Sequence, residues 1–138
     1  MQLFEGSGGY DAGEQRRDFV SIDDVVQVNL DFLDHSERSG IFNLGSGRAA
    51  TFNAVATATI NACRAAEGVA ALPFEALHRA GAIEYIAFPA GLREKYQSYT
   101  LADLGRLRAS GYAAPMRDIE AGVAKCVHAL LAPSAVNP

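Results

Sequence analysis

The stretch RRDFVSIDDVV, residues 16–26, decides the organisation of the chain, because a basic pair leads into a short apolar run and then into an acidic helix start. Phe19, Val20 and Ile22 are residue types that favour a short buried strand. We therefore expect a short strand after the basic pair and a helix at the end of the stretch.

The polar residues of the same stretch point to two interpretations. Asp23 and Asp24 are suited to cap the helix that follows, and Arg17 offers a rigid fork of five donors for a phosphate. The stretch predicts an anion-binding edge beside a strand-to-helix turn. The alternative is an exposed basic pair that precedes an ordinary helix cap.

Length and composition indicate one folding unit: the chain has 138 residues, of which 49% are hydrophobic and 20% charged. This is the composition of a soluble globular protein. No run approaches the roughly 18 apolar residues of a membrane span, and the start of the sequence lacks the pattern of an export signal. We therefore expect a cytoplasmic protein with no membrane partner. A net charge of -4 argues against a nucleic-acid partner, since affinity for the phosphate backbone requires many basic groups.

The cysteines and histidines do not form a recognisable site. Cys63 and Cys126 stand far apart on apolar helical patterns, so we expect buried free thiols. His35, His78 and His128 are equally scattered, without the spacing of metal ligands. We assign no metal site and no role to these residues.

The first half of the chain alternates between helical and strand patterns. A helix is expected from Asp24, and its Val25, Val28, Phe32 and Leu33 should pack on a sheet. Residues 41–44 have the composition of a strand that runs into a glycine loop at 45–48. Thr51 can cap the next helix, which Gly68 should end.

The second half begins with a variable excursion at residues 69–82, in which 74–79 form one or two helical turns. A strand is expected at residues 83–88. Thr100-Leu101-Ala102-Asp103 resembles a capping box for a short helix through Arg108, which Ser110-Gly111 ends. Asp118 opens the last helix, and residues 133–138 are expected to be a loose tail after a domain at 1–132.

The chain has few strands and lacks the usual signatures of a catalytic or dinucleotide site. The glycine clusters at residues 6–9 and 45–47 fail the dinucleotide fingerprint, so we expect both to form turns. No Ser-His-Asp set, cysteine nucleophile or Tyr-x-x-x-Lys pair can be assembled. The sheet therefore looks incomplete for an independent α/β enzyme.

Two further segments carry side chains suited to a ligand. Arg93, Lys95 and Tyr96 lie in a loop after a predicted strand, where ligands of open α/β sheets bind. Arg and Lys can neutralise phosphate, and Tyr adds a hydroxyl or a stacking face. The stretch from Phe4 to Ser7 offers a ring, a carboxylate and a glycine for close approach. The alternatives are a solvated loop with one anchoring aromatic side chain and a tetrapeptide without function.

An ordered set of motifs, taken together, resembles the carboxy-terminal part of the ADP-glyceromanno-heptose 6-epimerase family, from Leu3 to about Leu131. These enzymes are nucleotide-sugar epimerases of the extended short-chain dehydrogenase/reductase (SDR) group. The motifs are Leu3-Phe4-Glu5-Gly6-Ser7, Arg17-Asp18-Phe19-Val20, Ile41-Phe42-Asn43-Leu44-Gly45, Glu84-Tyr85-Ile86-Ala87-Phe88-Pro89, Lys95-Tyr96-Gln97 and Leu107-Arg108-Ala109-Ser110-Gly111-Tyr112.

The resemblance implies a small mixed α/β substrate-binding domain with several helices and few short strands, and with the Rossmann half absent. It also implies that Phe4, Glu5, Gly6 and Ser7 line an ADP-sugar site, that Arg17 contacts the diphosphate and that Tyr96 closes over the substrate. No catalytic or cofactor-binding residue is expected in this chain. The family belongs to lipopolysaccharide core biosynthesis.

Family members interconvert ADP-D-glycero-D-manno-heptose and ADP-L-glycero-D-manno-heptose at C6 through transient oxidation and reduction by NADP. The resemblance implies that NADP is held mainly by the absent amino-terminal domain, so the chain alone should be inactive. A homo-oligomer is expected of the full-length enzyme. Smaller departures from the family are Ser21 in place of a frequent Tyr, a longer insertion at residues 8–16, and Ser98-Tyr99.

Two other functions stay open at this point. The chain could belong to a related epimerase or dehydratase that acts on a UDP- or GDP-sugar, because the motifs around Arg17 and Asn43 are shared more widely. It could also be a non-catalytic interaction module that kept the fold and lost the ligand.

Overall fold

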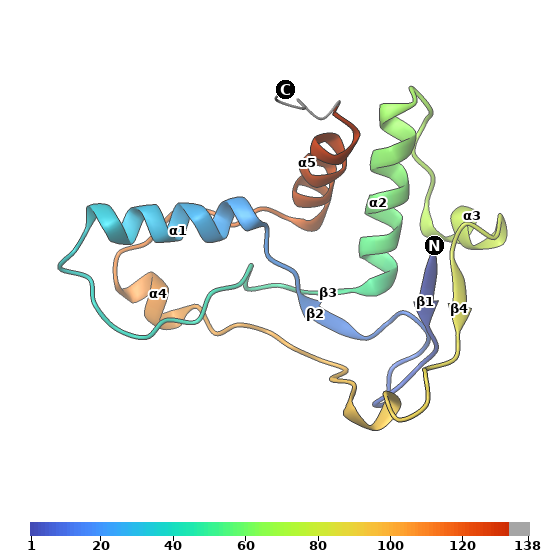
Figure 1. Cartoon of the computed structure of the whole chain (residues 1–138), viewed down its shortest axis with the longest axis horizontal. Helices are drawn as coiled ribbons and strands as arrows, with labels where there is room; N and C mark the ends of the chain where they lie inside the picture. The colour runs from blue at the N-terminus through green and yellow to red at the C-terminus, as the bar shows by residue number, and fades with distance from the viewer. Residues whose placement is uncertain (133–138) are drawn as a thin grey trace, which may run out of the picture.

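The computed structural model describes residues 1–132, in which several helices accompany short strands (Figure 1). This confirms the expected mixed α/β class, whereas the predicted tail at 133–138 lies outside the described residues. In chain order the elements are β1 (Gln2–Phe4), β2 (Arg16–Asp18), α1 (Ile22–Asp34), β3 (Ala49–Thr51), α2 (Phe52–Ala66), α3 (Phe74–Arg79), β4 (Glu84–Ile86), the 3₁₀ helix η1 (Arg93–Lys95), α4 (Gly105–Ala109) and α5 (Ile119–Leu131).

The strands form two separate pairs. β1 runs parallel to β4, with Phe4 opposite Ile86. β2 runs antiparallel to β3, with Arg17 opposite Ala50. The strand predicted at residues 83–88 is therefore confirmed in its central part, while β1 and β3 were not predicted because three residues carry too little periodicity.

Two hydrophobic clusters stabilise different parts of the chain. The α1 core consists of Val28, Leu107, Tyr112 and Met116, with Phe32, Phe42, Leu44 and Leu104 packed against it. The α2 core consists of Ala56, Leu77 and Ile83, with neighbours that include Leu3, Ile60 and Tyr85. Figure 1 shows α1 and α4 on one side, and α2, α3, β1 and β4 on the other, with β2 and β3 between them.

Several predicted helix ends are confirmed in atomic detail. Thr51 caps α2, since its hydroxyl accepts from the backbone N–H of Ala54 at 3.0 Å. Asp118 caps α5 in the same way, accepting from Ala121 at 2.8 Å. α2 ends just before Gly68, whose φ of +72° lies in the left-handed region that glycine adopts readily. The helical turns predicted at residues 74–79 are present as α3.

The strand expected from Phe19, Val20 and Ile22 is wrong. The ladder covers β2 at residues 16–18, and Ile22 is the first residue of α1, with 78% of its surface exposed. The ladder stops after Asp18 because Ala49, which lies opposite Asp18, is the first residue of β3. The loop before β3 hydrogen-bonds to the Asp18 carboxylate instead of pairing with the next residues. Apolar composition alone therefore placed the strand after Asp18, where β2 has already ended.

The predicted caps of α1 are also wrong. Ser21 is the N-cap, without a side-chain hydrogen bond, and both aspartates lie inside the first turn. Asp24 is buried and accepts from the backbone N–H of Arg117 at 2.7 Å, while its other oxygen pairs with the Arg117 guanidinium. Asp23 pairs with Lys125. These carboxylates connect α1 to the middle of α5 and to the segment before it.

The surroundings of α1 differ from the prediction. The helix packs on α4 and on residues 112–116 instead of on a sheet, and Leu33 is 75% exposed. Residues 41–44 form no ladder within the part of the chain that the structure describes, so the predicted strand is wrong. Their alternation is nevertheless real: Phe42 packs on Phe32 at 4.9 Å between ring centroids, whereas Ile41 is 84% exposed.

Two further expectations need correction. The capping box at residues 100–103 does not form, because α4 begins at Gly105 and its N-cap makes no side-chain hydrogen bond. Asp103 instead accepts from the N–H of Gly105 at 2.8 Å. Cys63 and Cys126 are free, as expected, but both are exposed. Each lies on a helix face that the rest of the described chain leaves uncovered.

Candidate functional site

An aromatic cluster forms beyond the carboxyl ends of β1 and β4. The parallel register brings Phe4, the last residue of β1, beside Phe88, which follows β4, and their rings stack at 4.6 Å. Tyr96, directly after η1, meets Phe4 edge-on at 5.8 Å and Phe88 at 5.0 Å. Two of the predicted site residues, Phe4 and Tyr96, therefore lie in contact although they are far apart in the sequence.

Arg17 approaches the same cluster from β2. Its guanidinium carbon lies 5.1 Å from the centroid of the Tyr96 ring, which is within the range of a cation–π contact. One of its nitrogens donates to the Arg16 carbonyl at 3.2 Å, and the other guanidinium donors make no hydrogen bond within residues 1–132. Burial raises the pKa of Tyr96, and the nearby Arg17 partly opposes this rise. The result is a neutral phenol beside a cation with several donors to offer.

The segment that follows Phe4 is held in place by Arg93. Glu5 donates its backbone N–H to Ile86 at 2.9 Å, extending the β1–β4 ladder. Arg93 donates to the Glu5 carboxylate at 3.1 Å and to the Gly6 carbonyl at 3.2 Å. A Cβ on Gly6 would lie 2.4 Å from the Tyr10 carbonyl oxygen, so only glycine fits there. Ser7, next in the chain, is buried.

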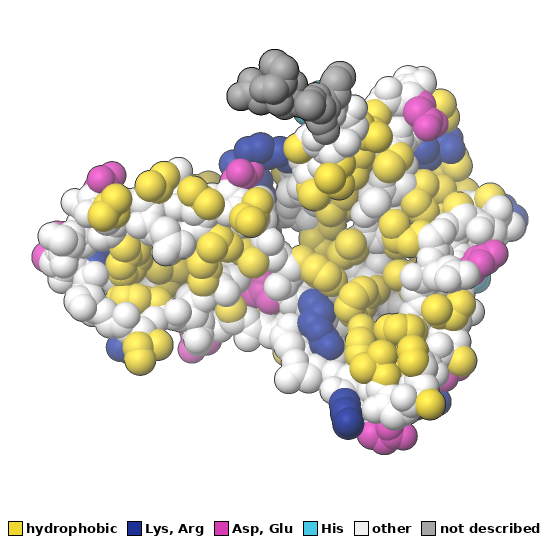
Figure 2. All heavy atoms as spheres, in the orientation of Figure 1, with side chains coloured by type: hydrophobic (Ala, Val, Ile, Leu, Met, Phe, Trp, Pro, Cys, Tyr) yellow, Lys and Arg dark blue, Asp and Glu magenta, His cyan; other side chains and the backbone are white. Residues whose placement is uncertain are grey.

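A cavity of about 320 Å³ lies within this cluster, at the low end of the size range of ligand pockets. On the face shown in Figure 2, basic side chains lie next to a hydrophobic patch between β2 and β1. Such a cavity suits a flat ring, and the neighbouring guanidinium suits an anionic group attached to it. The residues that line the cavity are Gln2, Leu3, Phe4, Gln15, Phe52, Ile86 and Tyr96.

Sequence reasoning missed three contributors to this region. Phe52 and Phe88 fitted the patterns of a helix and a strand, so their periodicity indicated packing only. Gln15 is 1% exposed, but a single glutamine before a basic pair gives no signal of burial. Lys95, which was singled out with Arg93 and Tyr96, is exposed on η1.

The glycine loop at residues 45–47 does surround an anion, but this anion is the chain's own Asp18. Ser46 donates its N–H and hydroxyl to one carboxylate oxygen, both at 2.6 Å. Gly47 and Ala102 donate their N–H groups to the other oxygen, each at 3.0 Å. Burial acts to raise the pKa of Asp18, but these hydrogen bonds outweigh it and hold the pKa below 3.8. The loop therefore makes a turn around an internal carboxylate.

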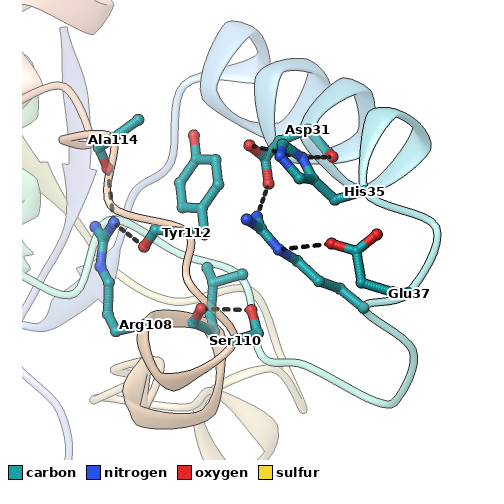
Figure 3. Close-up of polar contacts among 9 residues, drawn as sticks. Asp31, His35, Glu37, Arg108, Ser110, Tyr112 and Ala114 are labelled. Atoms are coloured by element: carbon teal, nitrogen blue, oxygen red, sulfur yellow. Dashed lines mark hydrogen bonds and ion pairs between the residues drawn. The ribbon is translucent and has the colours of Figure 1, made fainter.

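Polar side chains next to the α1 core make hydrogen bonds to nearby side chains and to backbone carbonyls. Figure 3 shows Asp31 of α1 and the adjoining His35 on one side of Tyr112, and Arg108 on the other. Asp31 pairs with Arg38 at 2.6 Å. Arg108 donates to the carbonyls of Tyr112 at 3.1 Å and Ala114 at 2.7 Å, and burial raises the pKa of Tyr112. These contacts fix the path of the chain after α4 and leave no converging set of groups for chemistry.

Within residues 1–132, no group of three or more His, Cys, Asp or Glu side chains is placed to hold a metal ion. None of the described helices is long and apolar enough to cross a membrane. The starts of the two helices that follow the strands of the β2–β3 pair do not suit a dinucleotide phosphate. α1 opens with Asp23 and Asp24, which repel phosphate, and α2 opens after an antiparallel strand with its cap already occupied by Thr51. We derive no cofactor chemistry from the described residues.

The fold and the site together indicate a class of protein: a small mixed α/β scaffold with an aromatic-lined cavity beside an arginine. Such a site is suited to an anion that carries a ring. Comparison with known proteins adds a particular relative. The chain is 56% identical over 131 residues to the ADP-L-glycero-D-manno-heptose-6-epimerase of Thiobacillus denitrificans. The alignment covers 95% of this chain and 40% of that protein, so the chain spans about two fifths of the relative's length. No protein-family model matches the chain. The resemblance to the heptose epimerase is thus confirmed at the level of sequence.

Proposed function

We propose that this chain is the substrate-binding portion of an ADP-glyceromanno-heptose 6-epimerase, an isomerase that interconverts the two ADP-heptoses at C6. The observation that carries the proposal is that Phe4 and Tyr96 line one cavity, while the Arg17 guanidinium lies over the Tyr96 ring beside it. The sequence identity to the heptose epimerase supports the choice of an ADP-sugar. The ligand contacts are assigned to Phe4, Glu5, Gly6, Ser7, Arg17 and Tyr96.

The arginine and the aromatic rings bind different parts of the ligand in this proposal. Arg17 has guanidinium donors to spare and binds the diphosphate. Phe4 and Tyr96 present ring faces and edges around the cavity, where they pack on a ring of the ligand. Arg93 neutralises Glu5, so this carboxylate does not repel the anion at full strength. A phenol is protonated at neutral pH, and burial raises the pKa of Tyr96 further.

The redox part of the reaction lies outside this chain. The sequence contains no Tyr-x-x-x-Lys pair and no dinucleotide fingerprint, and NADP is proposed to be held by the part of the enzyme that this chain does not span. When bound, NADP supplies the hydride acceptor and donor for C6. The residues of this chain bind and orient the ADP-sugar, and the chain alone is expected to be inactive. The full-length enzyme is proposed to be a homo-oligomer.

Substitution of Arg17 tests the proposal, and the adjacent arginine provides a matched control. Arg17→Ala should weaken binding of ADP-D-glycero-D-manno-heptose by about 1.5 to 3 kcal/mol, the contribution of a charge-assisted hydrogen bond. Arg16→Ala removes the same charge from the opposite face of β2, where the side chain is exposed, and should change the affinity much less. Isothermal titration calorimetry measures both affinities.

Equal losses in the two variants would mean that the arginines act only through general charge. Wild-type protein that binds a UDP- or GDP-sugar, and not the ADP-heptose, would favour the related epimerase or dehydratase and overturn the choice of nucleotide. Because Arg17 also stacks on Tyr96, the melting temperature of each variant should be recorded in the absence of ligand. A loss of affinity without a loss of stability would mean that the substitution acts on ligand binding and not on folding.

One observation favours a second function, a non-catalytic interaction module. Four large apolar residues of α1 form an exposed stripe at spacings of four, four and three residues, which places them on one side of the helix. They are Ile22 (78% exposed), Val26 (51%), Leu30 (50%) and Leu33 (75%). Self-association of the chain without any affinity for an ADP-sugar would support this function instead.

A further inference from the structure

We propose that Gln15 is a positioning residue that holds together the three segments of the candidate ADP-sugar site. The inference rests on the proposed function for the identity of the ligand, but the arrangement of Gln15 stands on its own contacts. Gln15 is 1% exposed and lies between the end of β1 and the start of β2. It is the largest polar side chain that the described fold buries completely.

The amide nitrogen of Gln15 reaches two acceptors on the Phe4–Ser7 segment. It donates to the Glu5 carbonyl at 2.7 Å and to the Ser7 hydroxyl at 3.3 Å. A carbonyl oxygen only accepts, so the side-chain amide must face Glu5 with its nitrogen, and the second N–H is then directed to Ser7. Both amide hydrogens are therefore used to fix the conformation of the backbone that follows β1.

The connection continues from Ser7 to the loop that carries Tyr96. The Ser7 hydroxyl accepts from Gln15 and also hydrogen-bonds to the Ser98 hydroxyl at 3.2 Å, where either hydroxyl can donate. Ser98 in turn accepts, through its carbonyl, from the backbone N–H of Arg16 at 2.9 Å. A Cβ on Gly8 would lie 2.2 Å from the Ser98 hydroxyl oxygen, so the loop of residues 6–14 and the Tyr96 loop are closely packed here.

These hydrogen bonds hold together the two ends of the loop at residues 6–14. Residues 6–14 leave the site after β1 and return to it at Gln15, directly before the two arginines of β2. The backbone carbonyl of Gln15 also accepts from Phe52, at the start of α2, at 3.3 Å. Because Gln15 and Ser7 are both buried, water cannot readily replace the Gln15 amide at the Ser7 hydroxyl. Its loss should release the Phe4–Ser7 segment and the Tyr96 loop relative to Arg17.

Gln15→Met tests the role, because methionine keeps the length and approximate volume of the side chain and removes both donors. We expect amide hydrogen exchange to accelerate roughly five- to tenfold over residues 5–10 and 96–100, with no change in α1 and α4. Gln27→Met makes the same substitution on an exposed position of α1 and should leave all of these rates unchanged. Unchanged exchange in both segments of Gln15→Met would overturn the proposal.

Ser98→Ala is the second variant, and it cuts the network at its far end. It should accelerate exchange over residues 96–100 and leave the amides near Glu5 protected, since Gln15 still holds that carbonyl. Gln15→Met should loosen both segments. Identical patterns for the two variants would contradict the order of contacts from Gln15 through Ser7 to Ser98.

Titration with ADP-D-glycero-D-manno-heptose tests whether the contacts of Gln15 also contribute to ligand binding. Gln15→Met should bind about tenfold more weakly than wild type at a temperature where both are folded, and Gln27→Met should bind as wild type does. A Gln15→Met variant that binds as tightly as wild type would overturn the positioning role. Wild-type protein that does not bind the ADP-heptose would instead contradict the proposed function, while the exchange data decide whether Gln15 organises the segments.

Discussion

Two stretches of similar composition end differently in this molecule. Residues 41–44, Ile-Phe-Asn-Leu, and residues 84–86, Glu-Tyr-Ile, both carry the apolar and aromatic residues typical of strands. The second forms β4, because β1 lies beside it in parallel register. The first has no ladder partner within residues 1–132 and packs against the α1 core through Phe42 and Leu44. Strand formation here is decided by the neighbour and not by the residues of the strand itself.

The same difference is visible at the surface. The chain exposes 8877 Å², whereas a compact protein of 14.6 kDa exposes roughly 6,900 Å². The α1 side contributes the exposed stripe defined above and Ile41, whereas the candidate site turns its aromatic rings toward one another. The site region satisfies its own apolar groups more completely than the α1 region does.

The largest expected effects come from the two hydrophobic cores, and they test whether the two regions unfold together. Leu107→Ala in the α1 core and Ile83→Ala in the α2 core each remove a side chain that is 1% exposed, so each should cost about 2 to 5 kcal/mol of stability. If the regions form one cooperative unit, both variants lower the same single transition in a urea titration followed by circular dichroism.

Leu33→Ala provides the control for these variants, since Leu33 is 75% exposed and should change stability by no more than about 0.5 kcal/mol. Two transitions, of which Leu107→Ala lowers one and Ile83→Ala the other, would show that the α1 and α2 cores are independent. That result would mean that the two regions unfold more independently than their packing suggests.

A smaller effect is expected at the junction between the regions, where Asp18 of β2 is held by the loop at residues 45–47. Hydrogen bonds hold the folded-state pKa of Asp18 below 3.8, so the charged form stabilises the fold at pH values above 3.8. This stabilisation is lost as the pH falls through the folded-state pKa, because the unfolded state then binds the proton more readily. Asp18→Asn should lower stability at pH 7 and flatten its dependence on pH below 4.

Unfolding midpoints of wild type and Asp18→Asn at several pH values measure this effect. Asp11→Asn is a matched control, because Asp11 is exposed at the tip of the 6–14 loop. An acid dependence that is equally steep in Asp18→Asn and wild type would mean that other carboxylates are responsible.

The smallest expected effects concern the helix caps. They compare the start of α1 with the starts of α2 and α5. Thr51→Ala and Asp118→Ala each remove an observed cap bond of α2 or α5 and should cost about 1 kcal/mol. Ser21→Ala should cost clearly less, because Ser21 makes no side-chain bond at the start of α1. Thermal unfolding of the three variants gives the ranking, and a loss in Ser21→Ala as large as in the others would contradict it.

The predictable part of the fold is local. The caps Thr51 and Asp118 and the stop at Gly68 were predicted because capping and left-handed glycine conformations depend on a few adjacent residues. The strands at residues 2–4 and 49–51 were not, because a three-residue strand exists only through its partner. Asp24 was expected at a cap and instead binds Arg117, which lies 93 positions away in the sequence.

The candidate site divides in the same way. Arg17, Tyr96 and the Phe4–Ser7 segment were selected from residue types and from the family resemblance, and the structure brings their rings and the guanidinium together. Their roles toward a ligand stay predictions. Gln15 and Phe88 were not selected, since burial of a glutamine and stacking of two phenylalanines follow from chain crossings that no short pattern contains.

The most direct test of the central claim is a titration of ¹⁵N-labelled chain with ADP-D-glycero-D-manno-heptose, followed by amide chemical shifts. The account predicts saturable shifts that concentrate at residues 4–8, 16–18 and 95–98, with little change over residues 26–40. Saturable shifts centred on the α1 stripe, or no shifts at millimolar ligand in the folded protein, would contradict an ADP-sugar site between β1, β2 and the Tyr96 loop.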